Sequence, residues 1–494
     1  MTERNRPDSI SERGTVRPSP AKENFNRFEH IMKRLSTSRL KNGHGATVSP
    51  PDGLNFPGLI RTAGTIPAGM SLLMSVLSSV LLSVLIPGAL FAEGVNSASE
   101  KQTPPPFPLA VEGGVLPVLD ASPGREEILR SIGRGVNFLI ERQNKNGSWG
   151  SAHRSKGLDL YAPGSSHAAF RAGTSSLALS ALIEVRAASL RDDEPLDLVG
   201  MGIEPGKIDN AIERGEWWLL EMLPDLRRSS VDCLYNVWGH AYGIECLGRM
   251  LEHRPGDGER TARIRDLIVR QVEMLRKCET IYGGWFYYDD GGFARPAETT
   301  ACFVSATGLL ALKKAEDHGI EIPRKMVDTT VASIIRQRNP DFSYLYGEYL
   351  KSQPRMPINR PAGSLGRSQA CNLALRKWGG HGVTEEIMEN WLKRFFGRNG
   401  WLDIGRKRPI PHESWFSIAG YFFYYGQYHA ALCIEELPES KRNIYRPYLA
   451  ETLVRLQEQD GSWWDFPLYD YHQQYGTAFA VLSLLKTIPR PQSE

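Results

Sequence analysis

Apolar residues between positions 126 and 488 follow two alternating helical patterns. Ile128, Ile132 and Val136 recur on one face of the first segment, which predicts an amphipathic helix. The next apolar segment, 172–183 (AGTSSLALSALI), is small or apolar on nearly every face, as is typical of a helix buried on all sides. The same two patterns return at the C-terminal end, where an amphipathic segment ends near Leu456 and an uncharged segment covers 477–485. The chain therefore predicts a repeated pair of helices.

Each amphipathic segment ends in a turn with an aromatic residue, and these residues give the period of the repeat. The turns read QNKNGSW before position 150, GGW before 286, GW before 402 and QEQDGSW before 464. From Trp285, the intervals to Phe342, Trp401 and Trp463 are 57, 59 and 62 residues. The interval from Trp149 to Trp285 is 136 residues, which is two periods of 68. We therefore expect a degenerate helix pair in that gap, around 208–223 and 235–251.

Six helix pairs of this length must stack to bury the apolar face that each of them exposes. Alternating amphipathic and fully apolar helices close most economically as two concentric rings. The predicted fold is an all-α (α/α)6 toroid over residues 126–488. A length of 494 residues would by itself suggest about three domains, but the repeat replaces that estimate with one ring.

The positive charge of the chain belongs to its N-terminal part. Residues 1–69 contain eleven Lys and Arg against six Asp and Glu, and the remainder contains 48 against 50. The net charge of +3 therefore divides into +5 and −2. The basic residues of 126–488 are interleaved with acids and form no stripe, so we expect no nucleic-acid partner. Residues 1–69 are polar and are predicted to be a disordered basic leader.

Residues 70–92 form an uncharged apolar segment with the core MSLLMSVLSSVLLSVLI. It is predicted to be a signal peptide, cleaved near Ala92, or a transmembrane anchor if it is not cleaved. Because basic residues precede it, the toroid is expected outside the cytoplasm, either exported or membrane-anchored. Residues 93–125 are rich in proline and glycine and are predicted to be a linker.

The six cysteines show no CxxC spacing, and most of them fall within apolar helical patterns. They are interpreted as buried thiols, with no zinc ribbon and no disulfide framework. No metal site and no cofactor are expected.

A family resemblance appears at the first turn. The segment RGVNFLIERQNKNGSW, which ends at Trp149, resembles the QW repeat of squalene and oxidosqualene cyclases, whose toroid is shared with protein prenyltransferase β-subunits. The segment ending at Trp463 repeats its second half, and the resemblance extends over 126–488. It implies that the glutamine and tryptophan tie an outer helix to its neighbour, so these tryptophans are structural. It also implies a hydrophobic, isoprenoid-like ligand.

The catalytic motifs of these families are incomplete in the chain. No Asp-x-Asp-Asp acid occurs, and Asp232-Cys233 matches two positions of the oxidosqualene cyclase Asp-Cys-Thr motif. The same region resembles the zinc-binding aspartate region of prenyltransferases, but Leu234 occupies the cysteine position. A thiolate displaced by one residue on a helix points about 100° away, so an intact zinc site is not expected.

In toroids of this type the loops that enter the inner helices line the pocket, which places the candidate site residues. The candidate catalytic residues are Asp232, Glu298 and His472, and the candidate ligand-binding residues are His412, Tyr421, Tyr424, Tyr425 and Tyr475. The segment 421–428 is the densest aromatic stretch and is predicted to form a wall for an isoprenoid chain. Structural roles remain open for each of them: packing for the aromatic residues, a helix cap for the glutamate and backbone hydrogen bonds for the two histidines.

Three hypotheses for the function follow. The first is an exported or membrane-tethered toroid that binds a hydrophobic isoprenoid-like ligand, whether or not it is catalytic. The second is a non-catalytic scaffold or interaction toroid with its cavity filled by tyrosines. The third is a glycan-active (α/α)6 enzyme with carboxylates and tyrosines around a sugar cleft.

Overall fold

The computed structural model describes residues 114–119, 121–156, 164, 166–226, 236–253, 258–287 and 299–488. All of them lie in one compact unit. These residues contain thirteen α-helices and five short 3-10 helices, and their only β pairing is in isolated bridges. The predicted leader, the predicted signal or anchor at 70–92 and most of the predicted linker lie outside the described residues.

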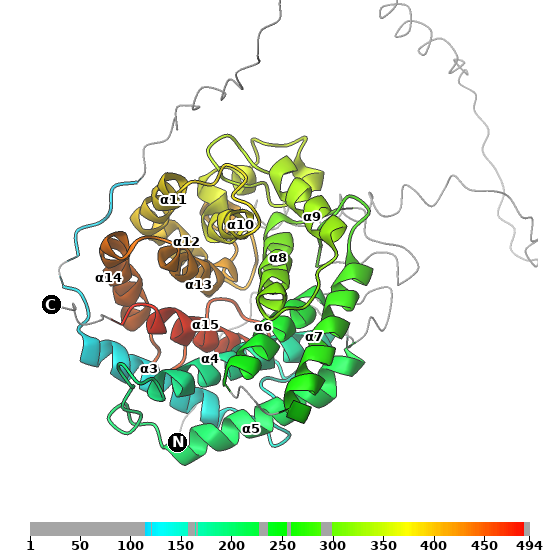
Figure 1. Ribbon diagram of the computed structural model, residues 1–494. Helices are drawn as coiled ribbons and strands as arrows, with labels where there is room; N and C mark the ends of the chain where they lie inside the picture. Colours follow the sequence, from blue (N-terminus) through cyan, green and yellow to red (C-terminus); the bar gives the residue numbers. More distant parts are fainter. Residues whose placement is uncertain are drawn as a thin grey trace, which may run out of the picture. The chain divides into compact units, whose positions relative to one another are not determined.

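Six helices form the inner ring of this unit (Figure 1). They are α4 (Ser166–Ser189), α6 (Asn236–His253), α8 (Cys302–Asp317), α10 (Leu365–Lys377), α13 (Phe422–Glu435) and α15 (His472–Leu485). Each packs against the next in this order, and α15 packs against α4, which closes the ring.

Each inner helix is preceded in the chain by an outer helix. The outer helices are α3 (Arg125–Glu141), α5 (Pro205–Met222), α7 (Gly258–Cys278), α9 (Arg324–Arg336), α11 (Glu385–Gly397) and α14 (Glu439–Arg455). The short helix α12 (Asn399–Gly405) lies between α11 and α13 in the chain, and the 3-10 helices are η1 (Leu223–Asp225), η2 (Glu348–Leu350), η3 (Pro357–Asn359), η4 (Ala362–Ser364) and η5 (Trp415–Ser417). The predicted all-α (α/α)6 toroid is confirmed, including the degenerate pair, which is α5 and α6.

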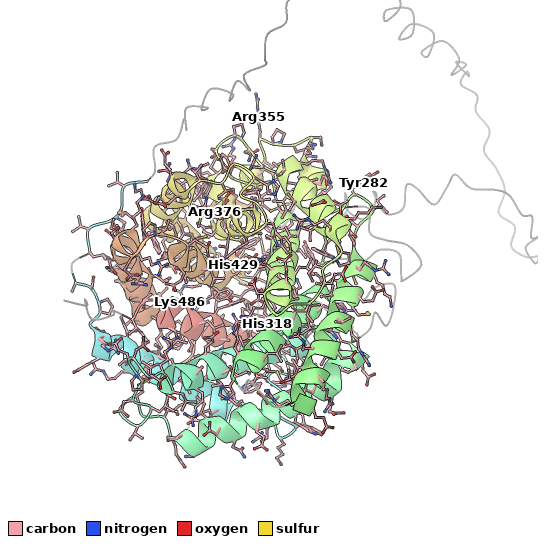
Figure 2. All side chains as sticks on the ribbon, viewed as in Figure 1. Tyr282, His318, Arg355, Arg376, His429 and Lys486 are labelled. Carbon is pink, nitrogen blue, oxygen red and sulfur yellow. The ribbon has the colours of Figure 1, made fainter. Side chains whose placement is uncertain are left out.

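The two sequence patterns correspond to the two rings. Helix α3 buries Ile128, Ile132, Val136 and Leu139 on one face, because only that face meets the inner ring. Every residue of 172–183 in α4 is buried, because an inner helix is covered by its outer partner and by its two neighbours in the ring. Figure 2 shows the same contrast: His429 lies among the inner helices, whereas Tyr282 and Arg355 lie at the outer edge.

Three of the predicted turn tryptophans anchor the end of an outer helix. The indole nitrogens of Trp149, Trp285 and Trp463 donate hydrogen bonds to the carbonyl oxygens of Leu139, Leu275 and Leu453 at 2.7–2.8 Å. All three indoles are fully buried. A carbonyl at a helix C-terminus has no partner within its own helix, so the indole supplies one.

The glutamine of the motif joins neighbouring outer helices. The amide nitrogen of Gln457 donates to the carbonyl oxygens of Gly461 and Ser131, both at 2.9 Å. Since Ser131 belongs to α3, this bond connects the last outer helix to the first. Gln143 does the same between its own turn and Ala211 of α5.

The predictions for the turns at Phe342 and Trp401 are wrong. Trp401 lies in α12, is half-buried and packs on the Phe416 ring with centroids 4.8 Å apart. Phe342 has φ of +60° and takes the place of the turn glycine, while Tyr344 is the buried aromatic residue of that turn. The turn requires its aromatic residue two positions after a left-handed residue, as Gly461 and Trp463 show, and counting aromatic residues by interval missed this register.

The described helices do not have the features of a membrane span. None of them combines the length and the hydropathy needed to cross a bilayer. The candidate membrane segment at 70–92 lies outside the described residues.

Candidate functional site

The inner helices all begin at the same end of the ring, because each follows an outer helix that runs the opposite way. Seven aromatic side chains gather at this end, from α6, α8, α13 and the loops before α8, α10 and α13. We call them the aromatic cluster: Trp238, Tyr287, Phe303, Tyr346, Tyr421, Phe422 and Tyr425.

The rings of the aromatic cluster are in continuous contact. The Phe303 ring lies 6.0 Å from Trp238, 5.2 Å from Tyr346 and 5.0 Å from Phe422, measured between centroids. Offset and edge-to-face arrangements at these distances are favourable because the positive edge of one ring meets the negative face of another. Trp238, Tyr287 and Tyr421 remain partly exposed, so the cluster has an accessible side.

A chain of hydrogen bonds runs along one side of the cluster. The Tyr287 and Tyr346 hydroxyls are 2.8 Å apart, and the Tyr346 and Tyr421 hydroxyls are 3.2 Å apart. The Tyr421 hydroxyl is 3.0 Å from Nε2 of His412. We call these four residues the hydroxyl chain.

The protonation state of His412 gives the hydroxyl chain a direction. Burial lowers the pKa of His412 to about 4, so its ring is neutral at pH 7. Nδ1 of His412 lies 2.8 Å from the Ser417 carbonyl, which can only accept, so Nδ1 carries the single ring proton. Nε2 must therefore accept from Tyr421. Each phenol has one proton to donate, so Tyr346 donates to Tyr421 and Tyr287 donates to Tyr346.

The loop that holds His412 contains four residues other than glycine with positive φ. They are Lys407 at 65°, His412 at 63°, Phe416 at 57° and Ser417 at 57°. Such residues cost about 1–3 kcal/mol each and are found mostly at active sites and ligand clamps. Holding this loop in its conformation therefore lowers the free energy of unfolding.

A buried carboxyl group lies beside the cluster. Asp465 is fully buried, and its side chain accepts from the Tyr475 hydroxyl at 2.8 Å and from the Tyr424 backbone nitrogen at 3.0 Å. Burial raises the pKa of Asp465 to about 7, although these two hydrogen bonds act in the opposite direction. This carboxyl group can therefore hold a proton near neutral pH.

The centre of the ring is filled by side chains that reach across it. Trp238 of α6 and Tyr425 of α13 lie on opposite sides of the ring, and their rings are 6.3 Å apart. The Tyr425 hydroxyl is 3.0 Å from that of Thr307 in α8, and Tyr242 of α6 lies 5.9 Å from Phe479 of α15. The aromatic cluster therefore lies at one end of the ring, on top of the side chains that fill the ring centre.

The opposite end of the ring contains a buried ionic network. Arg249 of α6 donates to Glu184 of α4 and to Glu245 at 3.0 Å, and to the Tyr428 hydroxyl of α13 at 3.2 Å. Burial by itself raises the pKa of Glu184, but the charges of Arg249, Lys486 and Lys314 together with the Arg249 hydrogen bond outweigh it and lower that pKa. A cavity of about 10 Å³ beside these groups has room for one water molecule. The network joins three inner helices.

The structure brings the sequence-predicted residues into three places. His412 and Tyr421 meet in the hydroxyl chain, Tyr424 and Tyr475 meet at Asp465, and Tyr425 lies in the ring centre. His472 is at the start of α15, where Nδ1 bonds the Tyr469 carbonyl at 2.6 Å, so His412 and His472 have different partners.

The other two candidate catalytic residues, Asp232 and Glu298, lie outside the described residues. Among the residues described, no group of His, Cys, Asp and Glu side chains is arranged to hold a metal ion.

Sequence reasoning missed Tyr287, Tyr346 and Asp465. Each of them stands two residues after the buried aromatic residue of a turn, at Trp285, Tyr344 and Trp463 respectively. In each case this position belongs to the segment that connects the turn to the following inner helix. The positions four residues after Gly283 and Gly461 identify Tyr287 and Asp465 from the sequence, whereas Tyr346 depends on the left-handed conformation of Phe342, which only the structure shows.

Comparison with known proteins identifies no family. No protein-family model matches the chain, and no curated protein matches it. Similar solved structures include the GH76A α-1,6-mannanase of Salegentibacter sp. HEL1_6 (11% identity, TM-score 0.40), an inactive variant of that enzyme with α-1,6-mannotetrose (10%, 0.42) and a D-mannose isomerase (14%, 0.43). The alignments cover 72%, 72% and 73% of this chain and 99%, 99% and 97% of those chains.

These similarities are too weak to carry an argument about function. The toroid part of the resemblance to squalene cyclases and prenyltransferase β-subunits is supported, and it rests on the arrangement of the helices described above. Membership of that family is not supported.

Proposed function

We propose that the protein is a glycan-active toroid whose aromatic cluster binds a sugar ring. The observation that carries the proposal is the pairing of partly exposed aromatic rings with the hydroxyl chain at the same end of the ring. The C–H face of a sugar packs against the negative face of an aromatic ring. Sugar hydroxyls need both donors and acceptors, and phenol and imidazole groups provide both.

The strained loop supports a role for His412 in ligand binding. Its positive φ holds the imidazole against Tyr421 and Tyr346. With a pKa of about 4, His412 is a weak base at pH 7 and acts as a hydrogen-bond partner. The proton transfer of the proposed reaction is therefore assigned to groups other than His412.

We assign the chemistry to Asp232 and Glu298. Each stands four residues before an inner helix in the sequence, before α6 and α8 respectively, and these helices are neighbours in the ring. The same two helices carry Trp238 and Phe303 of the aromatic cluster. Glycoside cleavage uses two carboxyl groups, one as general acid and one as nucleophile or base. Asp232 and Glu298 would supply one carboxyl group each.

Calorimetry tests this function by measuring the binding of a panel of neutral oligosaccharides to the purified full-length protein. Trp238→Ala is expected to weaken binding about 10-fold or more, because it removes the largest of the three partly exposed rings of the cluster. Tyr346→Phe breaks the hydroxyl chain and is expected to weaken it about 5- to 10-fold. Asp232→Asn and Glu298→Gln should retain binding and lose about 10²–10⁴-fold in cleavage rate.

Trp217→Ala is the matched control for the binding experiment. Trp217 is 61% exposed on the outer helix α5, so its removal should leave binding unchanged. Failure of every glycan to bind the folded wild type would refute the proposal. If the wild type bound squalene or a farnesyl lipid and Trp238→Ala lost this binding, the result would support the isoprenoid hypothesis.

A non-catalytic scaffold is the second candidate, and one observation favours it. Aromatic side chains of the opposite inner helices α6 and α13 meet across the ring centre, as expected of a toroid whose cavity is filled. A wild-type protein that binds neither a glycan nor an isoprenoid lipid would favour this candidate.

We also propose that the toroid acts outside the cytoplasm, through the apolar segment at 70–92. Its basic flank and apolar core have the features of an export signal or anchor. Cell fractionation of the full chain should place the toroid in the exported or membrane fraction, and deletion of 70–92 should move it to the cytoplasm. An unchanged distribution after the deletion would contradict this.

A further inference from the structure

One tryptophan at the end of the ring that carries the aromatic cluster is mostly exposed. Trp415 is 65% exposed, and of the eleven tryptophans, all of which lie in the described part of the chain, only Trp217 on the outer helix α5 is comparable. Trp415 is the first residue of η5, in the loop that also holds His412. A single exposed apolar side chain is common at a protein surface, so exposure alone does not mark a site.

The backbone that follows Trp415 is held in a conformation that costs folding free energy. Phe416 and Ser417 both have φ of 57°. Residues other than glycine enter the left-handed region singly as a rule, so two in succession are unusual. Two hydrogen bonds fix the turn: the Ser417 backbone nitrogen donates to the Ser414 carbonyl oxygen at 2.8 Å, and the Ser414 hydroxyl donates to the Ile418 carbonyl oxygen. The loop therefore fixes the backbone from which the Trp415 side chain projects.

Two further aromatic rings lie beside this indole. The Phe416 ring is 5.8 Å from the Trp415 ring and 4.8 Å from the Trp401 ring, measured between centroids. Phe416 and Trp401 are partly buried and pack against the hydrophobic core. We call Trp401, Trp415 and Phe416 the outer aromatic group. It combines one exposed indole with two rings that are anchored in the core.

The outer aromatic group is connected to the hydroxyl chain through His412. Nδ1 of His412 lies 2.8 Å from the Ser417 carbonyl oxygen, and the His412 ring is 5.2 Å from the Tyr346 ring of the aromatic cluster. Trp415 is three residues from His412, so the Cα atoms of these two residues are at most about 11 Å apart. An oligosaccharide of a few units is long enough to contact the aromatic cluster and Trp415 together.

The charged groups of the same loop are paired. Arg408 and Glu413 form an ion pair at 3.5 Å, and their side chains are partly exposed. A guanidinium group donates hydrogen bonds and a carboxylate accepts them, which are the two kinds of contact that sugar hydroxyls make. Because the two charges balance, this loop favours a neutral, hydroxyl-rich occupant over an ion.

We propose that Trp415 forms a second sugar subsite, which binds a distal unit of the glycan whose first unit lies on the aromatic cluster. The inference rests on the proposed function and deepens it, because it assigns an oligosaccharide of several units as the substrate class. The C–H face of the distal sugar packs on the exposed indole. Since the loop is already fixed by its hydrogen bonds, little ordering of this segment opposes binding.

The test is calorimetry of the folded full-length protein with disaccharides and hexasaccharides of glucose, mannose, galactose and xylose. The wild type is expected to bind one of these hexasaccharides about 3- to 10-fold more tightly than the corresponding disaccharide, which is the effect of one aromatic contact. Trp415→Ala should lower the hexasaccharide affinity to that of the disaccharide, and Trp415→Phe should retain part of the difference. Trp217→Ala is the matched control, because it removes an equally exposed indole from the outer helix α5 and should leave the difference unchanged.

Three results would overturn the second subsite and leave the proposed function standing. They are equal affinities of the wild type for disaccharide and hexasaccharide, a difference that persists in Trp415→Ala, and an equal loss of both affinities in that variant. Failure of all these sugars to bind the folded wild type would refute the proposed function and the subsite together. Sedimentation checks the other occupant: a wild-type dimer that becomes monomeric in Trp415→Ala would assign the indole to a second copy of the chain and overturn the proposal.

Discussion

Replacing Trp463 with alanine is expected to lower the free energy of unfolding by about 3–5 kcal/mol, as for other fully buried aromatic residues. The indole has no exposed surface, and its nitrogen donates to the Leu453 carbonyl at the end of α14. The variant leaves a cavity and an unpaired buried carbonyl at the turn that joins α14 to α15. Urea denaturation, followed by circular dichroism, measures the change.

Trp401→Ala is the matched control for this experiment. The two tryptophans looked equivalent in the sequence, but Trp401 is half-buried in α12 and packs on Phe416, with Arg398 over its ring. We expect it to cost about 1–2 kcal/mol, in the range of ordinary point substitutions. Equal losses for the two variants would contradict the distinction between turn anchors and other tryptophans.

Lowering the pH from 7 to 5 is expected to destabilise the toroid by a net of about 3–4 kcal/mol, because the loss from its three buried histidines exceeds the opposite contribution of Asp465. Burial lowers the pKa values of His240, His412 and His429 to about 4. Unfolding restores an ordinary value of about 6.5. Between pH 6.5 and 4 the unfolded chain therefore binds protons that the folded chain does not, so the free energy of unfolding falls as pH falls.

Asp465 acts in the opposite direction. Its pKa of about 7 in the fold exceeds its ordinary value, so the folded chain binds a proton there that the unfolded chain releases. Its contribution to stability is present at low pH and is lost as the pH rises through 7. Three histidines outweigh one aspartate, which sets the sign of the net effect.

Two variants separate these contributions in urea denaturation series at pH 7 and pH 5. His240→Gln should reduce the acid loss by about 2 kcal/mol, since one buried histidine no longer titrates. Asp465→Asn should increase the loss by a similar amount. A free energy of unfolding that stays constant or rises from pH 7 to pH 5 in the wild type would refute the role of buried histidines.

Much of the candidate site could be anticipated, because inner helices and the loops before them are recognisable in the sequence. His412 and Tyr421 were expected at the site and do meet there. Their partners Tyr346 and Tyr287 come from other repeats, 75 and 134 positions away from Tyr421. Periodicity within a helix carries no information about such contacts, since they depend on how the repeats are arranged around the ring.

The sequence by itself determined the class of fold: local periodicity separates outer from inner helices, and turn residues mark where each helix ends. The register of the turn at Phe342, the direction of the hydroxyl chain and the burial of Asp465 were decided only by the tertiary structure. Ring closure is the physical reason. It places side chains from distant repeats within a few ångströms and removes them from water, and both effects depend on the whole ring instead of on neighbouring residues.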